Sequence, residues 1–371
     1  MKIVIVTPLY PPDIGRPSEY VKGLAERAKG SFDVTVMTYG SIPEEVPGVR
    51  ISAAHKDWPI PLRMVEFTFR LWKETHQANA LWVCDGASIG LPSVIVGKLR
   101  GIPILRYVLM DEAREREAQS RTGTDGKISS GARLKVKTVR ALQDFVLKQA
   151  YRVCVPTASH EFGLVKIESS RVDELPFPSE GLQIAPFPPE KHPCEMLTFA
   201  WCLKPDDVRT LVLALKEAAS VQPELHLTIM SEAPWKDEAI KFAQGSGVAD
   251  KIRFLGYVSR VETAFLLRSS GLFFLGQGDS DLHREVAMAF EAGIPIVATE
   301  SDDHKEMIMH GTSGLLVPPG DVRASAMAIE RLIEDAALRD GLIEGGKQEL
   351  KTKFSWDAHI EAFRRLVENV Q

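Results

Sequence analysis

The stretch GLFFLGQGDSDLHREVAMAFEAGIPIVAT, residues 271–299, contains both patterns from which parallel α/β folds are built. Leu272–Leu275 is a short apolar run that predicts a buried strand, and Ile294–Thr299 predicts a second one. Between them a polar loop leads into an alanine-rich helix, which Gly293 closes. The order strand, helix, strand is typical of a parallel sheet.

The same alternation runs along the first half of the chain. Lys2–Thr7 is a β-branched run that predicts a buried parallel strand, and Ser18–Lys29 predicts an amphipathic helix with Ser18 as its N-cap. Further strands are expected at Asp33–Thr38, Ala80–Cys84, Pro103–Val108 and Arg152–Val155. Strands that alternate with helices in this way imply a doubly wound parallel sheet.

The pattern restarts after a proline-rich segment, Leu175–Pro193, whose composition is typical of an interdomain linker. Strands are then expected at Leu197–Trp201, Leu225–Met230 and Ile252–Leu255, and helices at Val208–Ser220, Lys236–Gly245 and Arg260–Ser269. We therefore expect an α/β protein with two Rossmann-like domains. The boundaries that we expect are 1–180 for the N-terminal domain, 181–194 for the linker, 195–353 for the C-terminal domain and 354–371 for a last helical segment, which contains a helix over Trp356–Asn369.

The composition narrows the class of protein. The chain has 371 residues, 44% hydrophobic and 26% charged, which suits a soluble globular protein of two domains. A net charge of -5 argues against nucleic acid as the main partner. Four scattered cysteines have no metal-ligand spacing and favour a reducing compartment. Because we find neither an apolar run of about 18 residues nor a signal peptide, we expect a cytoplasmic protein without a transmembrane span. We also expect neither a metal nor a cofactor.

The stretch 271–299 resembles the donor-binding segment of family-4 retaining glycosyltransferases, which reads roughly FVLPSLYEGFPLVLLEAMAFGIPVVAT. Three other stretches carry the same resemblance, and together they cover nearly the whole chain: KIVIVTPLYPPDIG at 2–15, FLGYVSRVETAFLLRSSGLFFL at 254–275 and HGTSGLLVPPGD at 310–321. The resemblance implies the GT-B architecture, in which two Rossmann-like domains face a cleft and the last segment, here 354–371, packs back on the N-terminal domain. It also implies an enzyme that transfers a sugar from a nucleotide donor bound in that cleft.

The residues that the family uses in the donor site are replaced here. When the two patterns are aligned without gaps on Gly293, the paired glutamates of the family fall on Ser280 and Met288. A serine hydroxyl supplies no carboxylate to hold the sugar, and a methionine cannot bond ribose hydroxyls. We therefore assign no catalytic residue.

A second family motif has also lost the residues that the family uses in the donor site. The family reads roughly FVGRLVPRKGVDLLLEAL where this chain reads FAWCLKPDDVRTLVLAL, residues 199–215. Trp201 replaces the glycine, Cys202 the arginine and Asp207 the lysine that the resemblance would place around the diphosphate. Asp206 and Asp207 introduce negative charge there, and a carboxylate about 6 Å from a phosphate costs ~3 kcal/mol at an effective dielectric of about 20.

Further changes surround this motif. Glu300, Asp302 and Asp303 replace a family loop that is close to DVGG, and Gly15-Arg16 replaces two glycines that approach the phosphate from the first domain.

Four residues are candidates for compensation: Lys204, Arg209, His283 and Glu291. Glu291 reaches the second glutamate's position, opposite His283, only if three helical residues are deleted. We prefer the gapless alignment, in which Glu285 and Glu291 are solvated helix residues.

Two features have alternative interpretations. Trp201 either fills the phosphate pocket as part of the core or offers a stacking face to a different ligand. The segment Arg133–Gln149 is amphipathic, with Leu134 and Val146 on its apolar side and several basic residues elsewhere. We favour a core helix with a solvated basic face over a helix that docks on an anionic membrane.

Two functions stay open. The first is a degenerate glycosyltransferase homologue, a pseudoenzyme that binds a nucleotide sugar weakly or not at all and acts as partner or regulator of an active glycosyltransferase in glycan synthesis. The second is an active retaining glycosyltransferase with an altered donor site, which transfers a sugar to a polysaccharide or glycolipid acceptor. Peripheral membrane contact is compatible with both.

Overall fold

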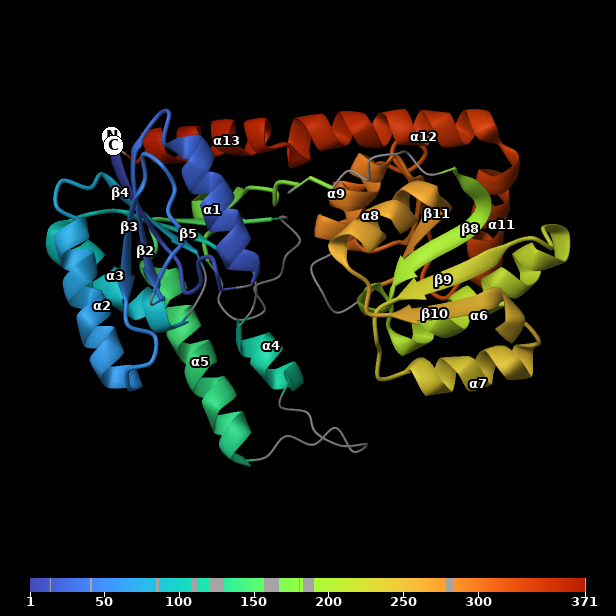
Figure 1. Ribbon diagram of the computed structural model, residues 1–371, viewed down its shortest axis with the longest axis horizontal. Coiled ribbons are helices and arrows are strands. Elements are labelled where there is room, and N and C mark those ends of the chain that lie inside the picture. The colour runs from blue at the N-terminus through green and yellow to red at the C-terminus, as the bar shows by residue number, and fades with distance from the viewer. Residues whose placement is uncertain are drawn as a thin grey trace. The chain divides into compact units, whose positions relative to one another are not determined.

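The computed structural model in Figure 1 describes residues 1–13, 15–40, 42–84, 87–108, 112–119, 130–156, 167–179, 181–182, 190–277 and 283–370. The chain forms two compact units. Unit 1 comprises Met1–Leu175 with Ile360–Gln371, and unit 2 comprises Pro176–His359. Among the residues predicted for the donor site, Ser280 and the side chain of Arg16 lie outside what the structure describes.

Unit 1 is built on a seven-stranded parallel sheet with the order β3-β2-β1-β4-β5-β6-β7. Its central strands, β1 and β4, are apolar runs with almost no exposed residue. The strands are β1 (Lys2–Val6), β2 (Asp33–Tyr39), β3 (Arg50–Ala54), β4 (Ala80–Cys84), β5 (Ile104–Tyr107), β6 (Arg152–Val155) and β7 (Val172–Glu174). The chain passes from β3 at one edge back to β4, so the direction of winding reverses beside β1.

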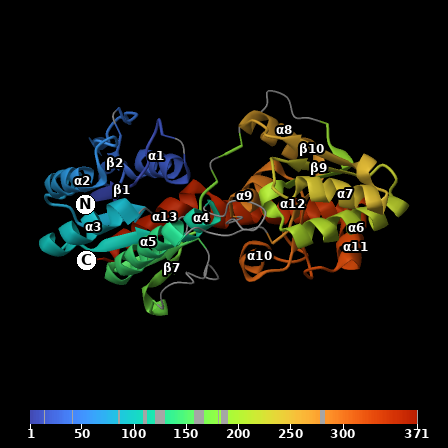
Figure 2. The ribbon, with the colours of Figure 1, turned by 90° about the horizontal axis from the view of Figure 1, so that it is seen from below.

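Helices cover both faces of this sheet because alternate side chains of each strand point to opposite faces. On one face α2 (Ile60–Glu74), α3 (Ala87–Arg100) and α5 (Ser130–Gln149) pack in a row against Leu81 and Val83 (Figure 2). The short α4 (Glu112–Gln119) packs against α5. The other face carries α1 (Arg16–Ala28) and the part of α13 (Trp356–Glu368) that belongs to unit 1.

Phe363 fixes α13 to this second face. Its ring packs edge-on against Trp82 of β4, with ring centres 4.8 Å apart, and against Phe32, at 5.8 Å. All three rings are almost completely buried.

The predicted N-cap of the first helix is wrong. The helix begins at Arg16 with Gly15 as N-cap, and the hydroxyl of Ser18 instead donates to the carbonyl oxygen of Asp13 at 2.5 Å. Pro17 explains the earlier start, because proline fits the first turn of a helix.

Unit 2 repeats the architecture with a six-stranded parallel sheet in the order β10-β9-β8-β11-β12-β13. Apolar clusters fill both faces of the sheet. Its strands are β8 (His192–Phe199), β9 (His226–Met230), β10 (Ile252–Gly256), β11 (Ser270–Leu275), β12 (Ile296–Thr299) and β13 (Leu315–Val317). Its helices are α6 (Pro205–Val221), α7 (Lys236–Ser246), α8 (Arg260–Ser269), α9 (His283–Ala292), α10 (Asp302–Met307), α11 (Val322–Glu334) and α12 (Ala336–Glu349).

The first strand of unit 2 differs from its predicted range. β8 starts at His192, inside the segment 181–194 that we expected as a linker, and ends at Phe199 rather than Trp201. Gly271 permits this pairing, since a Cβ there would lie 2.1 Å from the carbonyl oxygen of Pro193. Gly293 ends α9 as predicted, with φ of 64°, and β12 starts only at Ile296 because Pro295 has no N–H to donate.

No helix in the described part of the chain is both long enough and apolar enough to cross a bilayer.

Candidate functional site

The strand order of unit 2 indicates where a ligand would bind. The chain leaves β8 toward β9 on one side, whereas β11 lies on the other side of β8 (Figure 1). From β11 the chain leads to β12. Open α/β sheets bind ligands outside the carboxyl ends of the strands at such a reversal point. The candidate site therefore includes the segment after β8, which runs from Ala200 to the first turn of α6, and the segment after β11, which begins at Gly276.

Asp207 joins these two segments. Its Oδ2 accepts a hydrogen bond from the backbone N–H of Lys204, at 2.9 Å, and another from the backbone N–H of Gln277, at 2.8 Å. The first bond is part of a capping box, with Lys204 as N-cap and Asp207 as the third residue of α6. Gly276 makes room for the carboxylate, because a Cβ there would lie 2.8 Å from the Asp207 carboxyl carbon.

Asp207 is a buried negative charge, 9% exposed. Burial raises the pKa of its carboxyl, and the hydrogen bonds from Lys204 and Gln277 together with the Lys204 ammonium act in the opposite direction. Backbone N–H groups at the start of a helix form a ready site for an anion. Here the protein's own carboxylate takes one N–H group at the start of α6, that of Lys204, and one from the segment after β11, that of Gln277.

Trp201 lies in the 3-10 turn Ala200–Cys202 that follows β8. Its ring stacks on Phe199, with ring centres 4.5 Å apart and planes at 14°, and its Nε1–H donates to Glu285 Oε1 at 3.0 Å. The ring remains 42% exposed. Trp201 is therefore not a core residue, and of the two interpretations from the sequence only the exposed stacking face agrees with the structure.

Cys202 is fully buried, in the apolar cluster that also contains Phe199 and Leu275. Burial raises the pKa of its thiol well above the usual value. The sequence placed Cys202 at the position of a phosphate-binding arginine, but its side chain belongs to the core. The residue of this turn that a ligand can reach is Trp201.

Glu285 is a residue that the sequence reasoning missed. We expected a solvated helix residue, which is wrong, because Glu285 is 3% exposed and its carboxylate accepts the Trp201 N–H. The helical spacing could have indicated that Glu285 is buried, since it lies one turn before Ala289, which is also buried. α9 thus directs a carboxylate toward the segment after β8.

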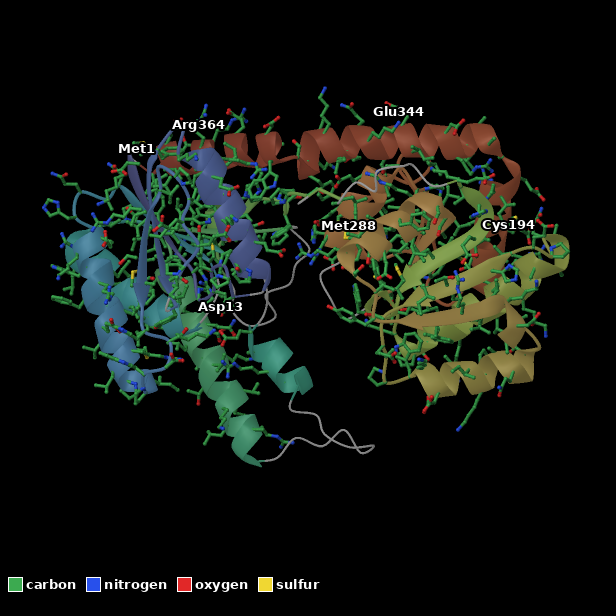
Figure 3. The ribbon with its side chains drawn as sticks, in the orientation of Figure 1. Met1, Asp13, Cys194, Met288, Glu344 and Arg364 are labelled. Atoms are coloured by element: carbon green, nitrogen blue, oxygen red, sulfur yellow. The ribbon has the colours of Figure 1, made fainter. Side chains whose placement is uncertain are left out.

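His283 and Glu291 lie near opposite ends of α9, about 12 Å apart along its axis at 1.5 Å per residue. Glu291 accepts hydrogen bonds from the Ser179 hydroxyl, at 2.6 Å, and from the Leu182 N–H, at 2.7 Å. Its half-buried carboxylate therefore holds the segment that follows Pro176, and it does not lie opposite His283. Met288, labelled in Figure 3, is half-buried and packs against the apolar cluster.

The two proposed compensating cations have different surroundings. Lys204 is exposed at the N-cap of α6. The Arg209 guanidinium lies over the ring of Phe242 on α7, 5.7 Å from the ring centre. Lys204 is thus the better placed of the two to meet an anion near Asp207.

The histidine in the segment after β12, His304, carries no positive charge at neutral pH. His304 is buried, and its Nδ1–H donates to the Thr299 carbonyl oxygen at 2.6 Å. Burial lowers the pKa of His304. Lys305 is paired with Glu300 at 2.9 Å, so its charge is compensated within the same segment.

Gly15 of unit 1 occupies a tight position at the start of α1. A Cβ there would come within 2.8 Å of Leu9 Cδ1. A larger residue at this position would require the Leu9 side chain to shift. Among the described residues of both units, no group of three or more His, Cys, Asp and Glu side chains is arranged to hold a metal ion.

Comparison with known protein families gives a match that lies within unit 2. Residues 204–349 match the family described as Glycosyl transferases group 1, a match that covers less than half of the chain. The chain is 29% identical over 153 residues to the lipopolysaccharide core biosynthesis glycosyltransferase LpsE of Rhizobium meliloti, which covers 41% of this chain and 44% of LpsE. It is 23% identical over 382 residues to the phosphatidyl-myo-inositol mannosyltransferase of Mycolicibacterium smegmatis, which covers 100% of this chain and 94% of that protein.

Among solved structures, the chain is similar to Anabaena Alr3699/HepE in complex with UDP-glucose, with a TM-score of 0.67 and 14% identity over the full length of both chains. This likeness confirms the expected α/β fold with doubly wound sheets, which is that of GT-B glycosyltransferases. Residues 204–349 are thus similar to Glycosyl transferases group 1, and the chain is similar to proteins that are named as glycosyltransferases.

Proposed function

We propose that this chain is a family-4-type glycosyltransferase homologue in glycan synthesis whose nucleotide-sugar site is impaired, and that it acts as a cytoplasmic partner or regulator of an active glycosyltransferase. Two similar proteins are named for lipopolysaccharide core biosynthesis and for mannosyl transfer to phosphatidyl-myo-inositol, which supports a role in glycan synthesis. The four cysteines are free thiols, as suits a reducing compartment.

This proposal rests on the two hydrogen bonds that the Asp207 carboxylate accepts. The resemblance places a donor diphosphate at the start of α6, where it would need backbone N–H groups and cations. Instead, one carboxylate oxygen bridges the N–H groups of Lys204 and Gln277. A diphosphate entering here would meet N–H groups that are already bonded and a negative charge within a few ångströms.

The expected size of the effect is large. Repulsion of ~3 kcal/mol, for charges about 6 Å apart at an effective dielectric of about 20, corresponds to roughly a hundredfold loss of affinity. Cys202 cannot restore an attractive charge, because its side chain is buried in the core.

The alternative function is an active retaining glycosyltransferase that transfers a sugar from a nucleotide donor to a polysaccharide or glycolipid. Glu285 and Trp201 favour it. Together they place a carboxylate and a partly exposed aromatic ring beside the reversal point of the sheet. A carboxylate can bond sugar or ribose hydroxyls, and an aromatic ring can stack on a base or a sugar face.

Calorimetric titration of the full chain with UDP-, GDP- and ADP-sugars distinguishes the two functions. The proposal predicts no binding at micromolar affinity to any of them, and it predicts that an active glycosyltransferase co-purifies with the chain. Micromolar binding with slow hydrolysis of one donor would instead establish the alternative.

The alternative makes a prediction of its own for Glu285→Gln. The amide oxygen of glutamine can still accept the Trp201 N–H, so the turn after β8 should keep its structure. Loss of the negative charge should then lower donor turnover by about a hundredfold or more, as is typical when a group that acts on the transition state is removed. Turnover that is unchanged in this variant would show that Glu285 has no part in the chemistry.

A further inference from the structure

Trp201 presents one open face of its ring at the candidate site of unit 2. The ring of Phe199 covers the other face, with ring centres 4.5 Å apart, and the indole N–H is bonded to Glu285 at 3.0 Å. These two contacts fix the ring, yet it stays 42% exposed. Because the open face is ordered before any ligand arrives, stacking on it costs little conformational entropy.

The charges around this open face are mainly negative. The segments after β8, β11 and β12 and the first turn of α9 meet at the reversal point of the sheet; they are 200–207, 276–277, 283–285 and 300–305. Together they contain six carboxylates and three Lys or Arg residues, a formal charge of -3. One of the three cations, Lys305, is paired with Glu300 at 2.9 Å. The site therefore repels anions and attracts cations.

A buried histidine in the same place has an acceptor that nothing uses. His304 is 1% exposed, and its Nδ1–H donates to the Thr299 carbonyl oxygen, so its Nε2 carries a lone pair. Among the described residues, this Nε2 has no hydrogen-bond partner. Burial lowers the pKa of His304, while its bond to Thr299 and the nearby carboxylates of Asp303 and Asp207 act in the opposite direction. A buried acceptor without a partner is costly, and a ligand that donates an N–H would satisfy it.

We propose that this site binds an organic cation, whose ammonium or guanidinium group lies over the open face of Trp201 and near Asp207. A cation within about 6 Å of a tryptophan ring centre is attracted by the negative face of the ring. Its N–H groups are also the donors that carboxylates and the Nε2 of His304 accept. Asp207 is within reach of the same ligand, because it binds the N–H of Lys204, three residues after Trp201, a span of at most about 11 Å.

This inference rests on the proposed function, because it names the ligand class that the altered site would hold in place of a diphosphate. An uncharged sugar or base is a poorer ligand, since it can stack on the ring but gains little from the surrounding carboxylates. Two sources present the required chemistry, an amino sugar and a Lys or Arg side chain of a partner protein.

Ligand-observed NMR of the full chain tests the proposal with two pairs of probes. Glucosamine is compared with glucose, and N-acetyl-arginine amide with N-acetyl-citrulline amide, which has a similar shape without the charge. At least one charged probe should bind at millimolar affinity or better, and about fivefold or more tightly than its uncharged counterpart. It should also shift the nitrogen-15 indole signal of Trp201, one of six tryptophans in the chain.

The two charged probes distinguish the sources. Binding of glucosamine alone would assign the site to an amino sugar. Binding of the arginine derivative alone would assign it to a basic side chain of a partner protein.

The chain offers a matched pair of variants. Trp201→Leu removes the open aromatic face and should weaken binding of the charged probe about fivefold. Trp58→Leu is the control, because Trp58 is 46% exposed and also stacks on one ring, that of His55, with ring centres 4.8 Å apart. The control should bind like the original chain, and circular dichroism checks that both variants are folded.

Asp207→Asn separates this inference from the proposed function. Removal of the charge should weaken binding of the charged probe about fivefold, whereas exclusion of a diphosphate by Asp207 requires the same variant to bind nucleotides more tightly. Weaker cation binding without a gain for nucleotides would support this inference and contradict the role of Asp207 in the proposed function. A gain for nucleotides with no binding of either charged probe would do the reverse.

Four results would overturn the proposal. They are the absence of binding by both charged probes, equally tight binding of their uncharged counterparts, equal behaviour of Trp201→Leu and Trp58→Leu, and unchanged affinity of Asp207→Asn for the charged probe.

Discussion

At the scale of single residues, the sequence identified the positions of interest but not the direction of their side chains. Trp201 and Cys202 are neighbours in one turn, yet the first is 42% exposed and the second is fully buried. No periodic pattern extends through a three-residue 3-10 turn, so residue type alone could not assign the two sides. Asp207 was recognised as a departure from the family, but its bond to Gln277, 70 residues away, depends on the fold.

The burial of Cys202 has a direct consequence for any attempt to restore the family arginine. Cys202→Arg would place a guanidinium among Phe199, Leu275 and other core residues. We expect the free energy of unfolding to fall by about 3 kcal/mol or more, because a buried charge without a partner is costly. Urea unfolding of this variant beside Cys202→Ala measures the difference. Equal stability of the two variants would mean that residue 202 can point toward solvent.

At the scale of elements, α9 shows what local signals can and cannot predict. Gly293 ended the helix at the predicted place because its positive φ suits glycine. The start of β8 was missed because His192 and Pro193 resemble linker residues, and only pairing beside Gly271 makes them part of a strand. The glycine that ends α9 is thus a clearer local signal than the residues that begin the central strand β8.

A hydrogen bond from His359 Nδ1–H in α13 to the carbonyl oxygen of Pro176, at 2.9 Å, helps to join the two ends of unit 2. His359 is buried, and burial lowers its pKa from 6.5 to about 4. The unfolded chain therefore binds this proton more readily than the folded one. Stability that is present above pH 6.5 should be lost as the pH falls toward 4, by up to about 3 kcal/mol from this group.

Urea unfolding between pH 7 and pH 4.5 checks this pH dependence. His359→Gln should show a smaller loss of stability on acidification, because glutamine can still donate to Pro176 but does not titrate. His226→Gln, at an exposed position of the same unit, is the control and should lose as much as the original chain. The account of His359 fails if its variant and the original chain lose stability in parallel.

At the scale of the whole molecule, the doubly wound fold was predictable because strands and helices alternate in both halves of the chain. The candidate site was not, because Glu285 became visible only once α9 was placed beside the segment after β8.

The central claim is that the Asp207 carboxylate keeps a nucleotide diphosphate out of the start of α6. Asp207→Asn tests it most directly, because the amide oxygen can still accept from Lys204 and Gln277 while the charge is removed. Asp206→Asn, at the exposed neighbouring position, is the matched control.

The measurement is calorimetric titration of both variants and the original chain with UDP, GDP and ADP. We predict that Asp207→Asn binds at least one of them about tenfold to a hundredfold more tightly than the original chain and Asp206→Asn do. Equal affinities of Asp207→Asn and the original chain for all three nucleotides would contradict the claim.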